Sequence, residues 1–167
     1  MPDTFIKIAS VTVGSGTAAT MEFTSIPSTY TDLVLKVSAR SGSTTGTNVA
    51  ITFNGSSSNV SMRLLYGTGS TAASLADSTK IAWEQSIASY TSNTFSSADV
   101  YIPNYAGSNY KSLSFDDTSE NNATLAFAEL GAGLWSSTAA INQITLTSSS
   151  ANFVQYTTAT LYGIKNS

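Results

Sequence analysis

The densest group of side chains that could carry chemistry in this sequence is acidic. Asp116, Asp117 and Glu120 lie close together in the string Asp116-Asp117-Thr118-Ser119-Glu120-Asn121-Asn122. Paired carboxyl groups can serve as the acid and base of a glycosidase, and carboxylate and amide oxygens can bind Ca²⁺. In a strand, however, Asp116 and Asp117 would point to opposite faces, and the string lacks the spacing and glycine of a calcium loop. We therefore expect a polar strand end and loop, and whether the cluster binds a cation stays open.

The remaining residue types exclude most of the common catalytic machinery. The chain has no His and no Cys, which rules out Ser-His-Asp and Cys-His nucleophile systems and imidazole metal sites. No spacing assigns Glu22, Glu84 or Glu129 to one place. We therefore predict that the protein is not an enzyme and has no catalytic residue, no metal ligand and no cofactor.

Aromatic residues around a proline turn are the best candidates for contact with a ligand or partner. We expect Tyr105 to be exposed at this turn, with Asn104 and Tyr110 as further contact residues. An exposed tyrosine offers a flat apolar ring with a polar tip, which suits contact with a sugar. Aromatic residues in alternating strands usually pack inward, so Trp135 and Tyr101 are expected in the core or in an interface.

Composition separates this chain from nucleic-acid and membrane proteins. Its 167 residues include 29 Ser and 24 Thr, while only 10% are charged and the formal net charge is -3. An acidic chain has the wrong sign for phosphate contacts, so we expect neither nucleic acid nor membrane as a partner. No signal peptide or apolar run of membrane-spanning length is present, and we expect the mature chain to begin at Met1.

Apolar and polar residues alternate with a period of two along most of the chain, which indicates β-strands. Residues 6–13 and 19–24 read as an opening hairpin around Gly14-Ser15-Gly16, with Lys7 on the same strand face as Ala9. A strand ends at Gly67-Thr68-Gly69-Ser70, and the following segment to Asp77 is small and polar, so we expect a surface loop there. Further strands are expected over 33–40, 49–53, 60–66, 81–87, 95–102, around 113–115, from 125 to about 130, around 144–146 and over 159–164.

These strands predict one all-β domain over residues 1–167, an antiparallel β-sandwich of the jelly-roll type with about eight to ten strands. Alternating apolar residues would bury one face of each sheet, and the outer faces would consist mainly of Ser and Thr. The glycines of Gly131-Ala132-Gly133 suggest a bulge or a close approach of the backbone to a neighbouring group.

Several strings of turns and strand ends together resemble small virion proteins of tailed phages that infect marine and aquatic bacteria, such as cyanophages. They are Ile8-Ala9-Ser10-Val11-Thr12-Val13-Gly14-Ser15-Gly16, Phe23-Thr24-Ser25-Ile26-Pro27-Ser28-Thr29-Tyr30-Thr31-Asp32-Leu33, Phe53-Asn54-Gly55, Tyr101-Ile102-Pro103-Asn104-Tyr105-Ala106-Gly107-Ser108, Glu120-Asn121-Asn122, Gly133-Leu134-Trp135-Ser136 and Ala159-Thr160-Leu161-Tyr162-Gly163-Ile164. The segment from Thr68 to Ser92 matches least. None of the strings is a catalytic signature.

The resemblance implies a non-enzymatic structural protein on the outside of the virion. The first expectation is a capsid decoration, or cement, protein that binds the lattice of the major capsid protein and stabilises the assembled head. A homotrimer would suit positions of local threefold symmetry on such a shell. The alternative is a head or tail fibre or receptor-binding module that contacts host surface polysaccharide. No heptad or repeat precedes Ile6, which favours decoration over a fibre tip.

Overall fold

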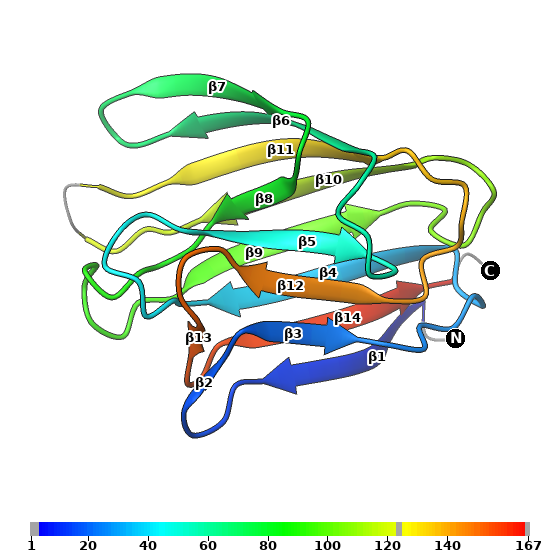
Figure 1. Cartoon of the computed structure of the whole chain (residues 1–167), viewed down its shortest axis with the longest axis horizontal. Helices are drawn as coiled ribbons and strands as arrows, with labels where there is room; N and C mark the ends of the chain where they lie inside the picture. The colour runs from blue at the N-terminus through cyan, green and yellow to red at the C-terminus, as the bar shows by residue number, and fades with distance from the viewer. Residues whose placement is uncertain (1–3, 123–124, 166–167) are drawn as a thin grey trace.

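The computed structural model describes residues 4–122 and 125–165, and these residues form β-strands joined by turns and loops (Figure 1). The strands pair antiparallel in two main sheets that pack against each other, so the predicted antiparallel β-sandwich is confirmed. The jelly-roll type stays a prediction. Within the described residues, no helix is long and apolar enough to span a membrane.

The large sheet holds eight of the fourteen strands found in the described residues. Its order is β1 (Phe5–Thr12), β14 (Thr158–Ile164), β4 (Asp32–Ala39), β9 (Ser96–Ile102), β10 (Lys111–Thr118), β11 (Ala128–Trp135), β6 (Val60–Gly67) and β7 (Ala72–Asp77). The first and last strands of the chain are therefore neighbours, and β1 and β7 form the two edges.

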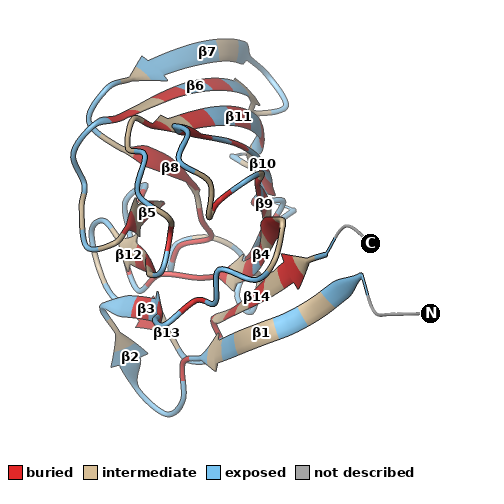
Figure 2. Cartoon of the chain, turned by 90° about the vertical axis from the view of Figure 1, so that its right-hand side faces the viewer, coloured by how far each residue is buried: buried red, intermediate tan, exposed pale blue. Residues whose placement is uncertain are grey.

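The small sheet has the order β3 (Thr20–Phe23), β12 (Ile144–Ser148), β5 (Asn48–Phe53) and β8 (Ile81–Glu84). A short pair of strands, β2 (Thr17–Ala18) and β13 (Phe153–Val154), lies beside it. Figure 2 shows the large sheet curving around the small one, with β7 beyond the last strand of the small sheet. Only the inner face of the large sheet is therefore covered by the second sheet.

The core lies between the two sheets and follows the alternation seen in the sequence. In β10, for example, Leu113 and Phe115 are buried while Ser112, Ser114 and Asp116 are exposed. Large rings fill the centre: the ring centroids of Trp83 and Phe115 are 5.7 Å apart, and those of Phe53 and Trp135 are 5.5 Å apart. Trp135 is therefore a core residue as predicted, whereas Tyr101 is 40% exposed.

A close backbone approach at Gly131 also matches the sequence. A Cβ atom on Gly131 would overlap the ring of Phe115, and one on Gly133 would crowd the side chains of Ile81 and Leu113. Both glycines lie in β11, where the absence of a side chain lets the inner-face rings pack directly on the strand.

Four local predictions were wrong. The predicted opening hairpin does not form, because β1 pairs with β14 in the large sheet while β3 pairs with β12 in the small sheet. A register shift between Lys7 and Ala9 is a bulge, so these two residues do not share a face. The expected loop that ends at Asp77 contains strand β7, whose alanines and serine gave little strand signal. The described residues hold fourteen strands where eight to ten were expected, partly because β2, β7 and β13 were not predicted.

Candidate functional site

The predicted contact residue Tyr105 is not exposed. Its side chain is 0% exposed, its hydroxyl donates to the carbonyl oxygen of Pro27, and the backbone N–H of Tyr30 donates to that hydroxyl at 3.4 Å. The expectation of an exposed Tyr105 is therefore wrong. The turn folds back over the core because Asn104 adopts a φ of 50° and its backbone N–H is held by Asp32 Oδ1 at 2.9 Å.

The other two predicted contact residues do lie at the surface. Asn104 is exposed, and Tyr110 is 58% exposed. Whether either one contacts a partner stays a prediction. The structure does not bring Tyr105 into a shared surface with them, because its ring belongs to the core.

Asp116 and Asp117 point to opposite faces of β10, as the alternation predicts. Asp116 is exposed on the outer face, whereas Asp117 lies between the sheets and is 3% exposed. Glu120 is exposed, and its carboxylate accepts a hydrogen bond from the backbone N–H of Asn122 at 2.6 Å. In the described part of the chain, no group of three or more Asp or Glu side chains is placed to hold a metal ion.

The fold gathers three acidic side chains that are far apart in the sequence. Asp117 of β10 lies directly opposite Glu129 of β11 in the large sheet. Glu84 comes from β8 of the small sheet, and its backbone N–H donates to Glu129 Oε2 at 3.0 Å. We call Asp117, Glu129 and Glu84 the carboxyl cluster. Sequence analysis did not place these three residues together.

Burial and mutual repulsion make the carboxyl cluster hard to ionise. Burial, with the charges of Glu129 and Glu84 adding to it, raises the pKa of Asp117 to about 9. Burial raises the pKa of Glu84 to about 7, with Glu129 adding to the rise and Asn48 and Lys80 opposing it. Burial also raises the pKa of Glu129. Among the described residues, neither carboxyl oxygen of Asp117 has a hydrogen-bond partner.

A pocket of about 200 Å³ opens next to this cluster, between β6 and β8. Its polar lining consists of Glu84, Glu129, Asn48 and Lys80. Lys80 Nζ donates to Asn48 Oδ1 at 3.0 Å, and Asn48 Nδ2 donates to Glu84 Oε1 at 3.3 Å. The apolar part of the lining is Tyr66, Phe127, Trp83, Met62, Leu64, Leu75 and Ala82. We call this the carboxyl pocket.

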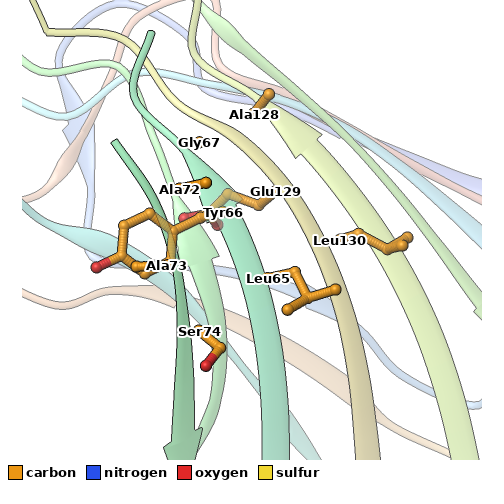
Figure 3. A pocket seen from close by; sticks show the side chains of 9 residues that line it. All are labelled: Leu65, Tyr66, Gly67, Ala72, Ala73, Ser74, Ala128, Glu129 and Leu130. Atoms are coloured by element: carbon orange, nitrogen blue, oxygen red, sulfur yellow. The ribbon is translucent and has the colours of Figure 1, made fainter. Parts of the chain in front are cut away.

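A second feature lies on the outer face of the large sheet, on the other side from the small sheet. Leu65 of β6 and Leu130 of β11 are directly opposite each other, and each is 60% exposed. Figure 3 shows these two leucines side by side, with the small residues Ala72, Ser74 and Ala128 around them. We call Leu65 and Leu130, together with Ala72 of β7 and Ala128 of β11, the aliphatic patch.

Protein-family models, curated proteins and solved structures were compared with the chain. None of the three comparisons found a match. The resemblance to phage virion proteins therefore stays a prediction.

The sequence did contain a signal for part of the carboxyl cluster. In β10, Asp117 is two and four residues from Phe115 and Leu113, so it lies on the same inward face of the strand. In β11, Glu129 is likewise two and four residues from Gly131 and Gly133. Alternation alone therefore places both carboxyl groups on an inner face. That Glu84 joins them from another sheet depends on the packing of β8 on β11, which no local pattern reveals.

Proposed function

We propose that this protein is a non-enzymatic structural protein of a phage virion, a decoration protein that binds the outside of the assembled capsid and stabilises it. The observation that carries the proposal is the aliphatic patch on the uncovered face of the large sheet. Contiguous apolar patches on a protein surface, especially ones rimmed by polar residues, commonly mark protein interfaces. The resemblance to phage virion proteins supplies the identity of the partner, the lattice of the major capsid protein.

The surroundings of the patch suit a protein partner. Register places Leu130 opposite Asp116 on one side, and the neighbouring cross-strand row pairs Ala132 with Arg63. Single charges of both signs therefore flank an apolar centre, which is the usual arrangement of an interface core and rim. Few ion pairs would form, so we expect binding that changes little with salt.

The edge of the sheet beside the patch adds a second means of contact. Within the described residues, β7 pairs only with β6, so its other side presents unpaired backbone groups. An edge strand of this kind can add a strand from another chain. A homotrimer at a local threefold position of the shell would bring three such edges to one partner lattice. Because the protein would bind the assembled lattice and not the separate capsid subunits, each bound copy would stabilise the shell by mass action.

The test measures binding to two surfaces. Purified protein is mixed with undecorated heads and, separately, with host cell envelopes, and the copies that pellet with each are counted. We expect many copies on each head and none on envelopes, at low and at high salt. Envelope binding without head binding would overturn decoration and support the receptor-binding alternative.

A pair of variants locates the contact. Replacing both Leu65 and Leu130 by Ser is expected to lower head binding by more than about tenfold, because burying one leucine contributes roughly 1.5–3 kcal/mol. The matched control is Leu125→Ser, since Leu125 is 46% exposed but lies outside the patch. Tyr110→Ser tests the contact predicted from the sequence. Undiminished binding by the double variant would show that the patch is not the interface.

A further inference from the structure

A lysine, an asparagine and a glutamate meet at one end of the small sheet, away from the residues of the aliphatic patch. Asn48 is the first residue of β5 and lies directly opposite Glu84, the last residue of β8. Lys80 comes just before β8 and four residues before Glu84, so alternation places it on the same face of the sheet. We call Lys80, Asn48 and Glu84 the Lys–Asn–Glu group.

Hydrogen bonds hold the three side chains of this group in a row. Lys80 Nζ donates to Asn48 Oδ1 at 3.0 Å, and Asn48 Nδ2 donates to Glu84 Oε1 at 3.3 Å. The side-chain amide of Asn48 therefore has an amine at its oxygen and a carboxyl group at its nitrogen. This order puts a nucleophile next to the amide group and a proton carrier next to the nitrogen that would leave.

The surroundings of the group suit proton transfer. All three side chains are half-buried and line the carboxyl pocket, whose remaining wall is mainly aromatic and aliphatic. Burial raises the pKa of Glu84 to about 7, with Glu129 adding to the rise and Asn48 and Lys80 opposing it. Near neutral pH such a carboxyl group can both take up and give back a proton, as a general acid–base group must.

We propose that Lys80 and Asn48 become joined by an isopeptide bond, with Glu84 as the catalytic residue that relays a proton. The bond between Lys80 Nζ and Asn48 Cγ forms, the bond between Cγ and Nδ2 breaks, and Nδ2 leaves as ammonia. The ammonium group of Lys80 gives up two protons: Glu84 passes one to Nδ2, and the released ammonia carries the other away as ammonium ion. The reaction occurs once in each chain, so it is compatible with a non-enzymatic structural protein.

The bond would close a covalent loop around one edge of the large sheet. Strands β6 and β7 lie between Asn48 and Lys80 in the sequence, whereas β5 and β8 are neighbours in the small sheet (Figure 1). The cross-link would therefore tie the β6–β7 excursion to the small sheet. A chain without Cys has no disulfide for this purpose, and closing a loop stabilises a fold by restricting the unfolded chain.

The test reads the bond from the masses of tryptic peptides of the full-length protein. Trypsin cuts after Lys and Arg, so a chain without the bond releases peptides 41–63, 64–80 and 81–111. Trypsin cannot cut after a Lys80 whose amine has become an amide. We therefore expect peptide 64–111 joined to peptide 41–63, with a mass below the sum of the two by one ammonia molecule. The intact protein should be lighter than its sequence by the same amount.

Two variants and a matched control test the roles of the side chains. Lys80→Arg keeps a positive charge and a hydrogen-bond donor but should yield no joined peptide. Glu84→Gln keeps an acceptor oxygen but cannot relay a proton, and we expect joining to be about 100-fold slower. Lys36→Arg is the control, because Lys36 lies in an exposed ion pair on the large sheet, and it should join as the wild type does.

Three outcomes would count against the proposal. Masses that match the unmodified sequence would overturn it. So would a peptide 41–63 that is lighter by one ammonia molecule while 64–80 is released free, because that pattern indicates a succinimide at Asn54-Gly55. Undiminished joining in Glu84→Gln would overturn the role of Glu84. The proposal does not depend on capsid binding: a protein that pellets with heads but carries no cross-link would refute this proposal alone.

Discussion

Two buried ionisable side chains of this sandwich, Arg40 and Asp117, differ in how far they are hydrogen-bonded. Arg40, which follows β4, is 9% exposed, and its guanidinium donates to the carbonyl oxygens of Ala88, Tyr90, Thr91 and Thr94. Asp117 is buried more deeply, at 3% exposed, and neither of its carboxyl oxygens has a partner among the described residues. The buried guanidinium is therefore enclosed in hydrogen bonds, whereas the buried carboxyl group of Asp117 has no such partner in the described part of the chain and, with a pKa raised to about 9, stays protonated at neutral pH.

The hydrogen bonds of Arg40 give it a structural role. Arg40 ties the loop around residues 88–94 to the core, since a single side chain replaces the strand pairing which that loop lacks. Lys111 does the same at the proline turn, where its Nζ donates to the carbonyl oxygens of Gly107 and Asn109 at 2.6 and 2.5 Å. The carboxyl cluster joins β8 to β11 through the bond from the Glu84 backbone N–H to Glu129 Oε2, while neither carboxyl oxygen of Asp117 has a partner among the described residues.

The largest loss of stability should come from replacing Arg40, whose buried charge is hydrogen-bonded. Arg40→Met leaves several carbonyl oxygens of the 88–94 loop without a donor, and we expect it to lower the free energy of unfolding by about 3–5 kcal/mol. Urea unfolding followed by fluorescence measures this loss. Arg40→Lys keeps the charge but not the fork of donors and should recover only part of it. Wild-type stability in Arg40→Met would show that the loop is held by other contacts.

Asp117, whose carboxyl group has no hydrogen-bond partner among the described residues, should have an intermediate effect on the free energy of unfolding, and this effect should depend on pH. The folded-state pKa of about 9 for Asp117 and about 7 for Glu84 lie above the unfolded values, so the native state holds more protons. Stability is then greatest below about pH 4 as far as these groups are concerned, and it falls as the pH rises towards 9. Glu129 and Lys80 face the same cluster, and Asp116 adds its charge from the opposite face of β10.

Asp117→Asn should therefore flatten the pH profile. We expect stability near that of the wild type below about pH 4 and a gain on the order of a few kcal/mol at pH 8, because the variant has no carboxyl group at that position that ionises more easily in the unfolded chain than in the folded one. Thermal unfolding at several pH values provides the measurement. Asp116→Asn is the matched control, since Asp116 is exposed on the other face of the same strand, is the smallest contributor to the raised pKa of Asp117, and should change the slope little when replaced. Equal slopes in wild type and Asp117→Asn would contradict the assignment.

The smallest effect should come from a charge pair on the surface. Lys36 Nζ and Asp99 Oδ2 are 2.5 Å apart on the outer face of the large sheet, and their side chains are 49% and 42% exposed. Exposed pairs of this kind contribute about 0–1 kcal/mol. Lys36→Ala should therefore change the urea midpoint little, and less still in high salt. If Lys36→Ala lost as much stability as Arg40→Met, exposure would not be what decides how much each charged side chain contributes to stability.

Alternation in the sequence predicted much of the fold because the core is built from period-two faces. It placed Leu113 and Phe115 of β10 inside, and it separated Asp116 from Asp117. It failed where pairing is set by distant partners. The apparent hairpin of β1 and β3 is split between two sheets, because β14 and β12 are the strands that they pair with.

The candidate sites show the same limit. Tyr105 at a proline turn has the composition of a surface contact, yet Asn104 reverses the chain and the tyrosine hydroxyl bonds to Pro27 inside the fold. The parity of Asp117 and Glu129 marks them as inward, but their meeting with Glu84 depends on how two sheets stack. Strand β7, rich in alanine and serine, becomes a strand only because β6 offers an edge.

The place of β14 has a consequence for the order in which this chain can fold during synthesis. β14 lies between β1 and β4, and pairs such as Lys7 with Tyr162 join the two ends of the sequence. β1 therefore has no partner strand while the ribosome makes the strands that lie between β1 and β14 in the sequence. Contacts so distant in sequence form slowly, and until they form the unpaired strand edges can aggregate. Cutting the chain before Thr158 should release β1 as well, so one truncation at the C-terminal end would strip two strands from the sheet.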